Sequence, residues 1–132
     1  MRLTAADHIN IRIRDVEATL AFYHGVLGLE SDRLDDYREG KRPLFAFRVN
    51  ESFIIHVFPD AEFERGPQAG YDHLALTVEG TTPSDLIAFL TEKGIPIEMQ
   101  TERLWGARGD GWACYVRDPD GYRVELKIYG DK

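Results

Sequence analysis

The chain has 132 residues and carries a formal net charge of -7, with a sequence pI of about 5.0. A hydrophobic content of 43% beside 30% charged residues is typical of a globular protein, and excludes a disordered or membrane-spanning chain. Because the acidic balance opposes binding to phosphate backbones, we do not expect nucleic acid as a partner, and because no apolar run approaches spanning length, we do not expect a membrane.

Length and cysteine content limit the fold and the compartment. The 132 residues fit a single domain that can bury its core without disulfides or a structural metal. The one cysteine, Cys114, cannot form an internal disulfide, and no N-terminal secretion signal is recognisable. We therefore expect one cytoplasmic domain, residues 1–132, in which any metal has a functional role.

The first half of the chain predicts a βαβββ module over about residues 6–60. Side chains from His8 to Ile13 alternate between apolar and polar, which is typical of a half-buried strand. Asp15 can cap a helix over about Val16 to Leu27, where apolar residues recur at helical spacing. Three further strands are expected, at about residues 30–37, 42–49 and 52–58.

The second half repeats this order over about residues 70–130, after a linker at residues 59–70 that is rich in proline, glycine and charge. A strand is predicted from His73 to Val78, followed by a helix that Thr82 caps and Gly94 ends. Asp118 to Gly121 predicts a tight turn. The remaining strands are expected at about residues 95–103, 112–117 and 122–129.

A histidine stands at the same position in the first strand of each module. The two strands begin Asp7-His8-Ile9 and Asp72-His73-Leu74, and both histidines lie on the face opposite the apolar residues. We predict an α+β fold in which the two modules form a curved eight-stranded mixed sheet with the helices outside. The first and last strands of each module would then line a shared concavity.

The last strand of each module offers one more candidate ligand. His56 has apolar neighbours on both faces of residues 53–58, so we expect it to be buried and to need a partner, of which a metal is one. Glu125 lies in the last strand of the second module. Three imidazoles and a carboxylate suit nickel, zinc, manganese or iron better than calcium or magnesium. Taken singly, a histidine in a strand is more often a hydrogen-bonded packing residue than a ligand, and Glu125 alone would be a solvated strand residue.

Four segments together resemble the vicinal oxygen chelate superfamily, which includes glyoxalase I, bleomycin-resistance proteins, fosfomycin-resistance enzymes, methylmalonyl-CoA epimerases and extradiol dioxygenases. These segments are Asp7-His8-Ile9, Phe22-Tyr23-His24-Gly25-Val26-Leu27-Gly28-Leu29, Asp72-His73-Leu74-Ala75 and residues 118–126. The resemblance covers nearly the whole chain. It implies that the first and last strands of each module supply metal ligands, which here are His8, His56, His73 and Glu125.

The resemblance implies a glyoxalase-like enzyme that chelates vicinal oxygens of a small-molecule substrate on a divalent metal. Glu125 is the candidate base for removing a proton alpha to a carbonyl, and His56 is either a ligand or a base. Glyoxalase I commonly has a second carboxylate at the position of His56. Three alternatives therefore stay open: an Fe(II) extradiol-type dioxygenase using His8, His73 and Glu125, a thiol transferase, and a non-catalytic drug-binding resistance protein.

The resemblance also implies a homodimer, with the site formed either within one chain or across two. Candidate substrate-pocket residues are Asn10 and Arg12, which share a face with His8, and Arg123, which shares one with Glu125; Trp105 and Trp112 are the others. Residues 105–111 are glycine-rich and predict a loop over the cavity or a plain surface connection.

Overall fold

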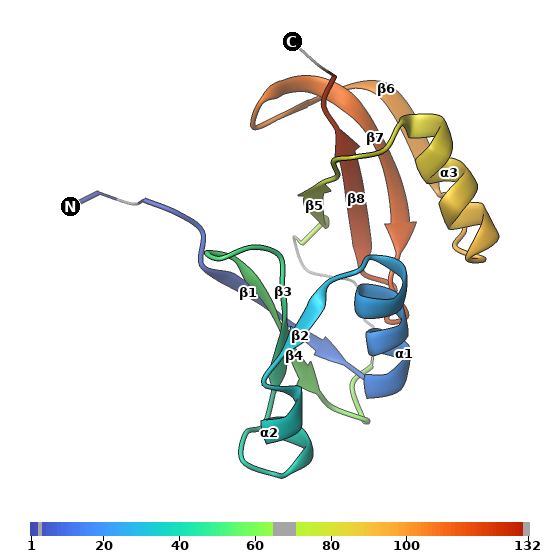
Figure 1. Ribbon diagram of the computed structural model, residues 1–132. Helices are drawn as coiled ribbons and strands as arrows, with labels where there is room; N and C mark the ends of the chain where they lie inside the picture. Colours follow the sequence, from blue (N-terminus) through green and yellow to red (C-terminus); the bar gives the residue numbers. More distant parts are fainter. Residues whose placement is uncertain (3, 65–70, 131–132) are drawn as a thin grey trace. The chain divides into compact units, whose positions relative to one another are not determined.

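The computed structural model describes residues 1–2, 4–64 and 71–130. These residues form two compact units, one ending at Glu64 and the other comprising the described residues from Tyr71 onward. Each unit contains one four-stranded mixed sheet and at least one helix (Figure 1). The predicted α+β fold is confirmed, with the strands arranged as two four-stranded sheets.

The first unit pairs its first strand with its last. Its sheet has the order β1-β4-β3-β2, in which β1 and β4 are parallel and the other neighbours are antiparallel. The elements are β1 (His8–Ile13), α1 (Val16–Leu20), η1 (Ala21–Val26), β2 (Glu30–Asp32), α2 (Leu34–Arg38), β3 (Phe45–Arg48) and β4 (Ile54–Pro59). The parallel pair places Asn10 directly beside His56.

A helix covers nearly the whole range predicted for residues 16–27, but it changes from α-helical to π-helical hydrogen bonding part-way along. Asp15 caps it as expected, because its Oδ1 accepts a hydrogen bond from the Ala18 backbone N–H at 2.8 Å. After Leu20 the α-helix α1 becomes the π-helical turn η1. Tyr23 of this turn stacks on Phe47 of the sheet with ring centroids 5.2 Å apart, and both side chains are buried.

The strand predicted for residues 30–37 is wrong in its second half. β2 ends at Asp32, Arg33 adopts a left-handed backbone with φ of 65°, and α2 follows. Asp35 and Asp36 stand in the first turn of this helix, where the N-terminal end of the helix dipole favours negative charge. The first unit therefore carries a helix that the second unit does not have between its corresponding strands.

The second unit repeats the same topology. Its sheet has the order β5-β8-β7-β6, again with the first and last strands parallel. The elements are β5 (His73–Thr77), α3 (Pro83–Glu92), β6 (Met99–Gly106), β7 (Gly109–Arg117) and β8 (Arg123–Ile128). The predicted cap is confirmed, since Thr82 Oγ1 accepts from the Asp85 backbone N–H at 3.2 Å. The predicted turn closes with the Gly121 N–H donating to the Asp118 carbonyl at 2.9 Å.

The loop predicted for residues 105–111 is instead the end of a β-hairpin. β6 and β7 stay paired up to Gly106 and Gly109, which leaves only Ala107 and Arg108 as the turn. Gly109 has φ of 97°, a conformation that glycine adopts at little cost. Trp105 stands beside this turn with 83% of its surface exposed.

The predicted linker is described only in part. β4 runs to Pro59, and the Asp60 backbone N–H donates to the Ile13 carbonyl at 2.8 Å, so the chain stays bound to the first sheet beyond that strand. Residues 65–70 of the predicted linker lie outside the described residues. Within the described ranges, no helix combines the length and apolar character needed to cross a bilayer.

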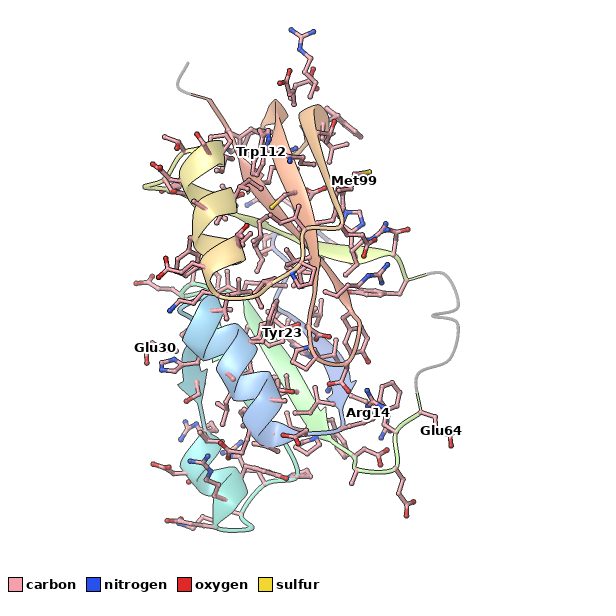
Figure 2. All side chains as sticks on the ribbon, turned by 90° about the vertical axis from the view of Figure 1, so that its right-hand side faces the viewer. Arg14, Tyr23, Glu30, Glu64, Met99 and Trp112 are labelled. Carbon is pink, nitrogen blue, oxygen red and sulfur yellow. The ribbon has the colours of Figure 1, made fainter. Side chains whose placement is uncertain are left out.

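Strand alternation divides each sheet into a packing face and a polar face. Figure 2 draws the side chains on the ribbon, with Tyr23 labelled in the first unit and Trp112 in the second. In the second unit, Cys114 pairs with Leu126 on the packing face, whereas Tyr115 pairs with Glu125 on the polar face. In the first unit, Ile55 and Val57 are fully buried, while His56 between them points to the polar face. The four proposed ligands therefore all lie on polar faces.

The close approach of Gly111 to the neighbouring strand yields a stability prediction. A Cβ atom at Gly111 would stand 2.8 Å from the backbone carbonyl oxygen of Ile128, which cannot move without distorting the sheet. We expect Gly111→Ala to lower the free energy of unfolding by about 1–3 kcal/mol, measured by urea denaturation. The control is Gly130→Ala, whose added Cβ meets no atom within 4 Å. Equal unfolding midpoints for the two variants would contradict the steric argument.

Candidate functional site

The first unit brings two imidazole rings together. His8 of β1 and His56 of β4 stack with their ring centroids 4.3 Å apart and an angle of 27° between the ring planes. The parallel pairing of the two strands places both side chains on the same face. His56 was predicted to be buried, but its side chain is only half-buried. Strand β4 has neighbours on both edges, β1 and β3, yet the polar face of β4 is partly exposed at His56.

The surroundings of His56 favour its neutral imidazole form. Burial lowers the pKa of His56 and the neighbouring His8 lowers it further, while Asp7 acts in the opposite direction. The Asp7 carboxylate lies 2.6 Å from Nδ1 of His8. Neutral imidazole is the form that binds a metal ion, so the His8–His56 pair has the chemistry of a ligand pair.

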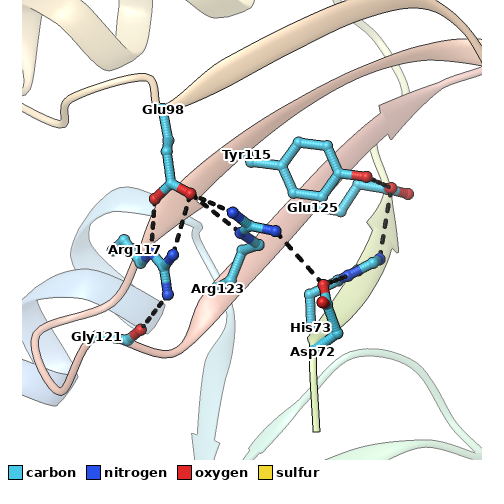
Figure 3. Close-up of polar contacts among 8 residues, drawn as sticks. All are labelled: Asp72, His73, Glu98, Tyr115, Arg117, Gly121, Arg123 and Glu125. Carbon is cyan, nitrogen blue, oxygen red and sulfur yellow. Dashed lines mark hydrogen bonds and ion pairs between the residues drawn. The ribbon is translucent and has the colours of Figure 1, made fainter. Parts of the chain in front are cut away.

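The second unit brings an imidazole and a carboxylate together (Figure 3). Nε2 of His73 on β5 lies 3.6 Å from Oε1 of Glu125 on the adjacent parallel strand β8. Glu125 is only 4% exposed, which is unusual for a carboxylate and calls for polar partners. Two ligand atoms that are each about 2.1 Å from one metal ion stand roughly 3.0–4.2 Å apart, so the 3.6 Å separation fits metal binding.

Tyr115 supplies the missing partner for Glu125. Its hydroxyl donates to Oε1 of Glu125 at 2.7 Å, and its ring meets the His73 ring edge-on at 5.3 Å between centroids. Burial, followed by the hydrogen bond to Glu125, raises the pKa of Tyr115 to about 12. This contact was not predicted from the sequence. The turn at Asp118–Gly121 could have revealed it, because pairing Arg117 with Arg123 across that turn sets Tyr115 opposite Glu125.

A network of charges continues from His73 to the rim of the sheet. Asp72 lies 2.6 Å from Nδ1 of His73, and Arg123 Nη1 lies 3.5 Å from the same carboxylate. Arg123 also donates a hydrogen bond to the carboxylate of Glu98, and Arg117 donates a second one to the same carboxylate at 2.6 Å (Figure 3). The hydrogen bond from His73 is the main cause that lowers the pKa of Asp72. The hydrogen bonds from Arg117 and then Arg123 lower the pKa of Glu98 to about 2.

Each unit thus holds two of the four predicted ligands as a close pair. In the described parts of the chain, no group of three or more histidine, cysteine, aspartate or glutamate side chains has the geometry of a metal site. The first unit contributes a nitrogen–nitrogen pair and the second a nitrogen–oxygen pair.

The predicted substrate-pocket residues have different surroundings. Asn10 and Arg12 share the polar face with His8 as expected, but Arg12 donates to Asp60 at 3.1 Å and lies over the Phe58 ring at 5.0 Å. Arg123 is held by Glu98 and Asp72, as described above. Trp112 pairs with Ile128 and therefore lies on the face opposite Glu125, near the start of α3. Trp105 belongs to the exposed hairpin.

A pocket beside His56 was not anticipated from the sequence. It has a volume of about 260 Å³, and its lining includes three arginine side chains, which are Arg33, Arg42 and Arg48. Arg48 is bound at 2.8 Å by Asp32, which also lines the pocket. The pairing of Ala46 with His56 could have predicted this place for Arg48, two residues further along the same face.

Cys114 has the surroundings of a packing residue. Its side chain is fully buried on the face opposite Glu125, and burial raises its thiol pKa to about 11. A nucleophilic cysteine requires a lowered pKa and access to substrate, and Cys114 has neither.

Comparison with known proteins identifies the family. The model of the glyoxalase/bleomycin resistance protein/dioxygenase superfamily matches residues 5–126. The chain belongs to this superfamily. A probable lactoylglutathione lyase of Synechocystis is 31% identical over 127 residues, covering 90% of this chain and 91% of the relative. A virulence protein of Salmonella typhimurium is 27% identical over 134 residues, covering 98% of this chain and 87% of the relative.

Similar solved structures agree with the fold. The crystal structure of the Salmonella typhimurium virulence protein has a TM-score of 0.72 at 26% identity, covering 98% of this chain and all of the other. An integron cassette protein from Vibrio cholerae has a TM-score of 0.77 at 25% identity and covers 98% of each chain. A lactoylglutathione lyase from Agrobacterium tumefaciens has a TM-score of 0.67 at 22% identity, covering 96% of this chain and 95% of the other, a likeness of fold alone.

The Glu98 contacts generate a prediction of pH-dependent stability. Because the folded state lowers the pKa of Glu98 from 4.5 to about 2, its contribution to stability is present above about pH 4.5 and is lost as the pH falls toward 2. We expect the urea midpoint of Glu98→Gln to fall less than that of the wild type between pH 5 and pH 3. Glu102→Gln, which removes an exposed carboxylate, is the control and should behave as the wild type. Parallel pH profiles for wild type and Glu98→Gln would refute the role of these contacts.

Proposed function

We propose that this protein is a metal-dependent enzyme of the glyoxalase type, in which His8, His56, His73 and Glu125 hold one divalent ion of nickel, zinc, manganese or iron. The observation that carries the proposal is the 3.6 Å approach of His73 Nε2 to the buried carboxylate of Glu125. The similarity to lactoylglutathione lyases over nine-tenths of the chain supports the reaction class.

The proposal requires the histidine pair of the first unit and the His73–Glu125 pair of the second to serve the same ion. The two pairs come from one chain or from two chains of a homodimer. Imidazole nitrogen and carboxylate oxygen are both accepted by these transition metals, whereas calcium and magnesium prefer oxygen alone. When bound, such an ion polarises adjacent substrate oxygens and stabilises the negative charge that proton removal creates.

Glu125 is the proposed base. It takes a proton from the hydroxyl-bearing carbon alpha to a substrate carbonyl and returns it to the former carbonyl carbon, while the hydroxyl proton passes to the former carbonyl oxygen. Substrate and product are then isomers and no oxidant is needed. The contacts with Tyr115 and His73 both involve Oε1. Oε2 is therefore the oxygen that we assign to proton transfer. His56 serves as the fourth ligand or as a second base.

The substrate is a small molecule with a polar or anionic part. The pocket beside His56 has a volume of about 260 Å³, and its lining includes Arg33 and Arg42, both within 4 Å of the Asp36 carboxylate. Guanidinium groups favour carboxylate or phosphate oxygens. We further propose a cytoplasmic site of action, which the buried free thiol of Cys114 supports.

Metal binding is the first prediction from this proposal. We expect untagged protein to hold about one equivalent of a transition metal per complete site, and His73→Ala to lower the affinity at least tenfold because it removes a ligand. The measurement is elemental analysis followed by titration against a chelating dye. His24→Ala is the matched control, since His24 is exposed and bound to the Leu29 carbonyl. A metal content below about a tenth of an equivalent would favour the drug-binding alternative.

Turnover is the second prediction. On metal-reconstituted protein we expect isomerisation of the hemithioacetal of methylglyoxal and glutathione, and a loss of at least about 100-fold in kcat for Glu125→Gln, which cannot accept the proton. Retained metal content and an unchanged circular dichroism spectrum would separate loss of the base from loss of the site. Full turnover in Glu125→Gln would refute its role. Activity only on catechols with iron would point to the dioxygenase alternative instead.

A further inference from the structure

Both units contain the same contact between a histidine and the aspartate that precedes it. Asp7 Oδ2 lies 2.6 Å from Nδ1 of His8, and Asp72 Oδ1 lies 2.6 Å from Nδ1 of His73. Figure 3 shows the second of these contacts, with the aspartate on one side of the imidazole and Glu125 on the other. The proposed function uses the far side of each ring and leaves the aspartates without a role.

The direction of the hydrogen bond follows from the chemistry of the two groups. An ionised carboxylate has no hydrogen to donate, so the hydrogen must be on Nδ1 of the histidine. In a neutral imidazole the other nitrogen, Nε2, then has a free lone pair. In His73 that nitrogen is the atom which lies 3.6 Å from Glu125. The aspartate therefore selects the tautomer whose lone pair lies toward the proposed ligand partner.

We propose that Asp7 and Asp72 are positioning residues that hold His8 and His73 as Nε2 metal ligands. This inference rests on the proposed function, because it assigns the two aspartates to the same metal site. A carboxylate on Nδ1 fixes the rotation of the ring and makes Nε2 a stronger electron donor.

Fold stability does not account for the two pairs. The side chains of Asp7 and Asp72 are 87% and 72% exposed. Contacts between side chains at such exposed positions add little to stability and often nothing measurable. A contact of the same length at the matching position of both units is thus better explained by its effect on the imidazole than by its effect on folding.

The two aspartates are themselves held in different ways. Asp72 lies near Arg123, and Arg123 in turn donates to Glu98, the residue before β6. The orientation of Asp72 therefore depends on contacts between distant parts of the second unit. Asp7 directly precedes β1, and its backbone carbonyl accepts from the Ile54 N–H at 3.1 Å, which ties it to the neighbouring strand. In both cases the aspartate is anchored beside the first residue of a strand.

The first test uses metal-free protein and reads the tautomer directly. Long-range ¹H–¹⁵N NMR spectra, recorded well above the ordinary imidazole pKa of about 6.5, distinguish protonated from unprotonated ring nitrogens. We expect Nδ1 to be protonated in His8 and His73 of the wild type, and Nε2 to become the main protonated nitrogen of the neighbouring histidine in Asp7→Ala and Asp72→Ala. His24 is an internal control, because its Nδ1 faces the Leu29 carbonyl at 2.8 Å in every variant.

The second test measures metal affinity. We expect Asp7→Ala and Asp72→Ala each to weaken zinc binding by about tenfold, the lower end for residues that support a ligand. Asp7→Asn and Asp72→Asn keep an acceptor but lose the charge, so they should retain the tautomer and lose less affinity. Asp35→Ala and Glu102→Ala remove exposed carboxylates elsewhere in each unit and should leave zinc affinity unchanged.

The outcomes separate this inference from the proposed function. If the wild type binds zinc, and the alanine variants keep both its affinity and its tautomers, the two aspartates are surface ion pairs and the inference is wrong. If the wild type binds no metal, the proposed function fails, and the tautomer spectra still show whether the aspartates orient the rings. An equal loss of affinity in the Asp35→Ala control would reveal a general effect of charge and would also overturn the inference.

Discussion

The parallel pairing of the first and last strands of each unit is the constraint on which the candidate site depends. β1 lies beside β4 and β5 beside β8, although about forty to fifty residues separate the paired strands in sequence. Because neighbouring strands in register share their faces, this pairing sets His8 with His56 and His73 with Glu125. The turns and helices between the paired strands contribute to the candidate site only by maintaining this register.

The two units use the same topology for different electrostatics. In the first unit a half-buried imidazole stacks on a second one, and its lowered pKa favours the neutral form. In the second unit the carboxylate is nearly fully buried and depends on the Tyr115 hydroxyl and the His73 ring. Burying a carboxylate with so few hydrogen-bond donors destabilises the fold unless a positive group lies nearby. A bound cation would therefore be favoured more strongly in the second unit than in the first.

The sequence predicted most of the elements because their signals are local: alternation for His8–Ile13, side-chain caps at Asp15 and Thr82, and the turn at Asp118–Gly121. It failed at α2 and at the hairpin near Trp105, where polar residues and glycines fit several conformations and strand pairing decides. The phase of the two histidines was readable, but the 3.6 Å approach of His73 to Glu125 was not, because it depends on which strands become neighbours.

His56 distinguishes this chain from the glyoxalase I pattern, in which a second carboxylate commonly occupies its position. A divalent ion bound by three neutral imidazoles and one carboxylate keeps a net positive charge, whereas two carboxylates would cancel it. Such a site attracts anionic oxygens more strongly and releases them less readily. The arginines that line the pocket beside His56 are each paired with Asp32 or Asp36, so their charge is already largely compensated. Under the proposed function, we therefore expect the residual charge of the ion to favour a substrate whose bound form is negative near the first unit's histidine pair.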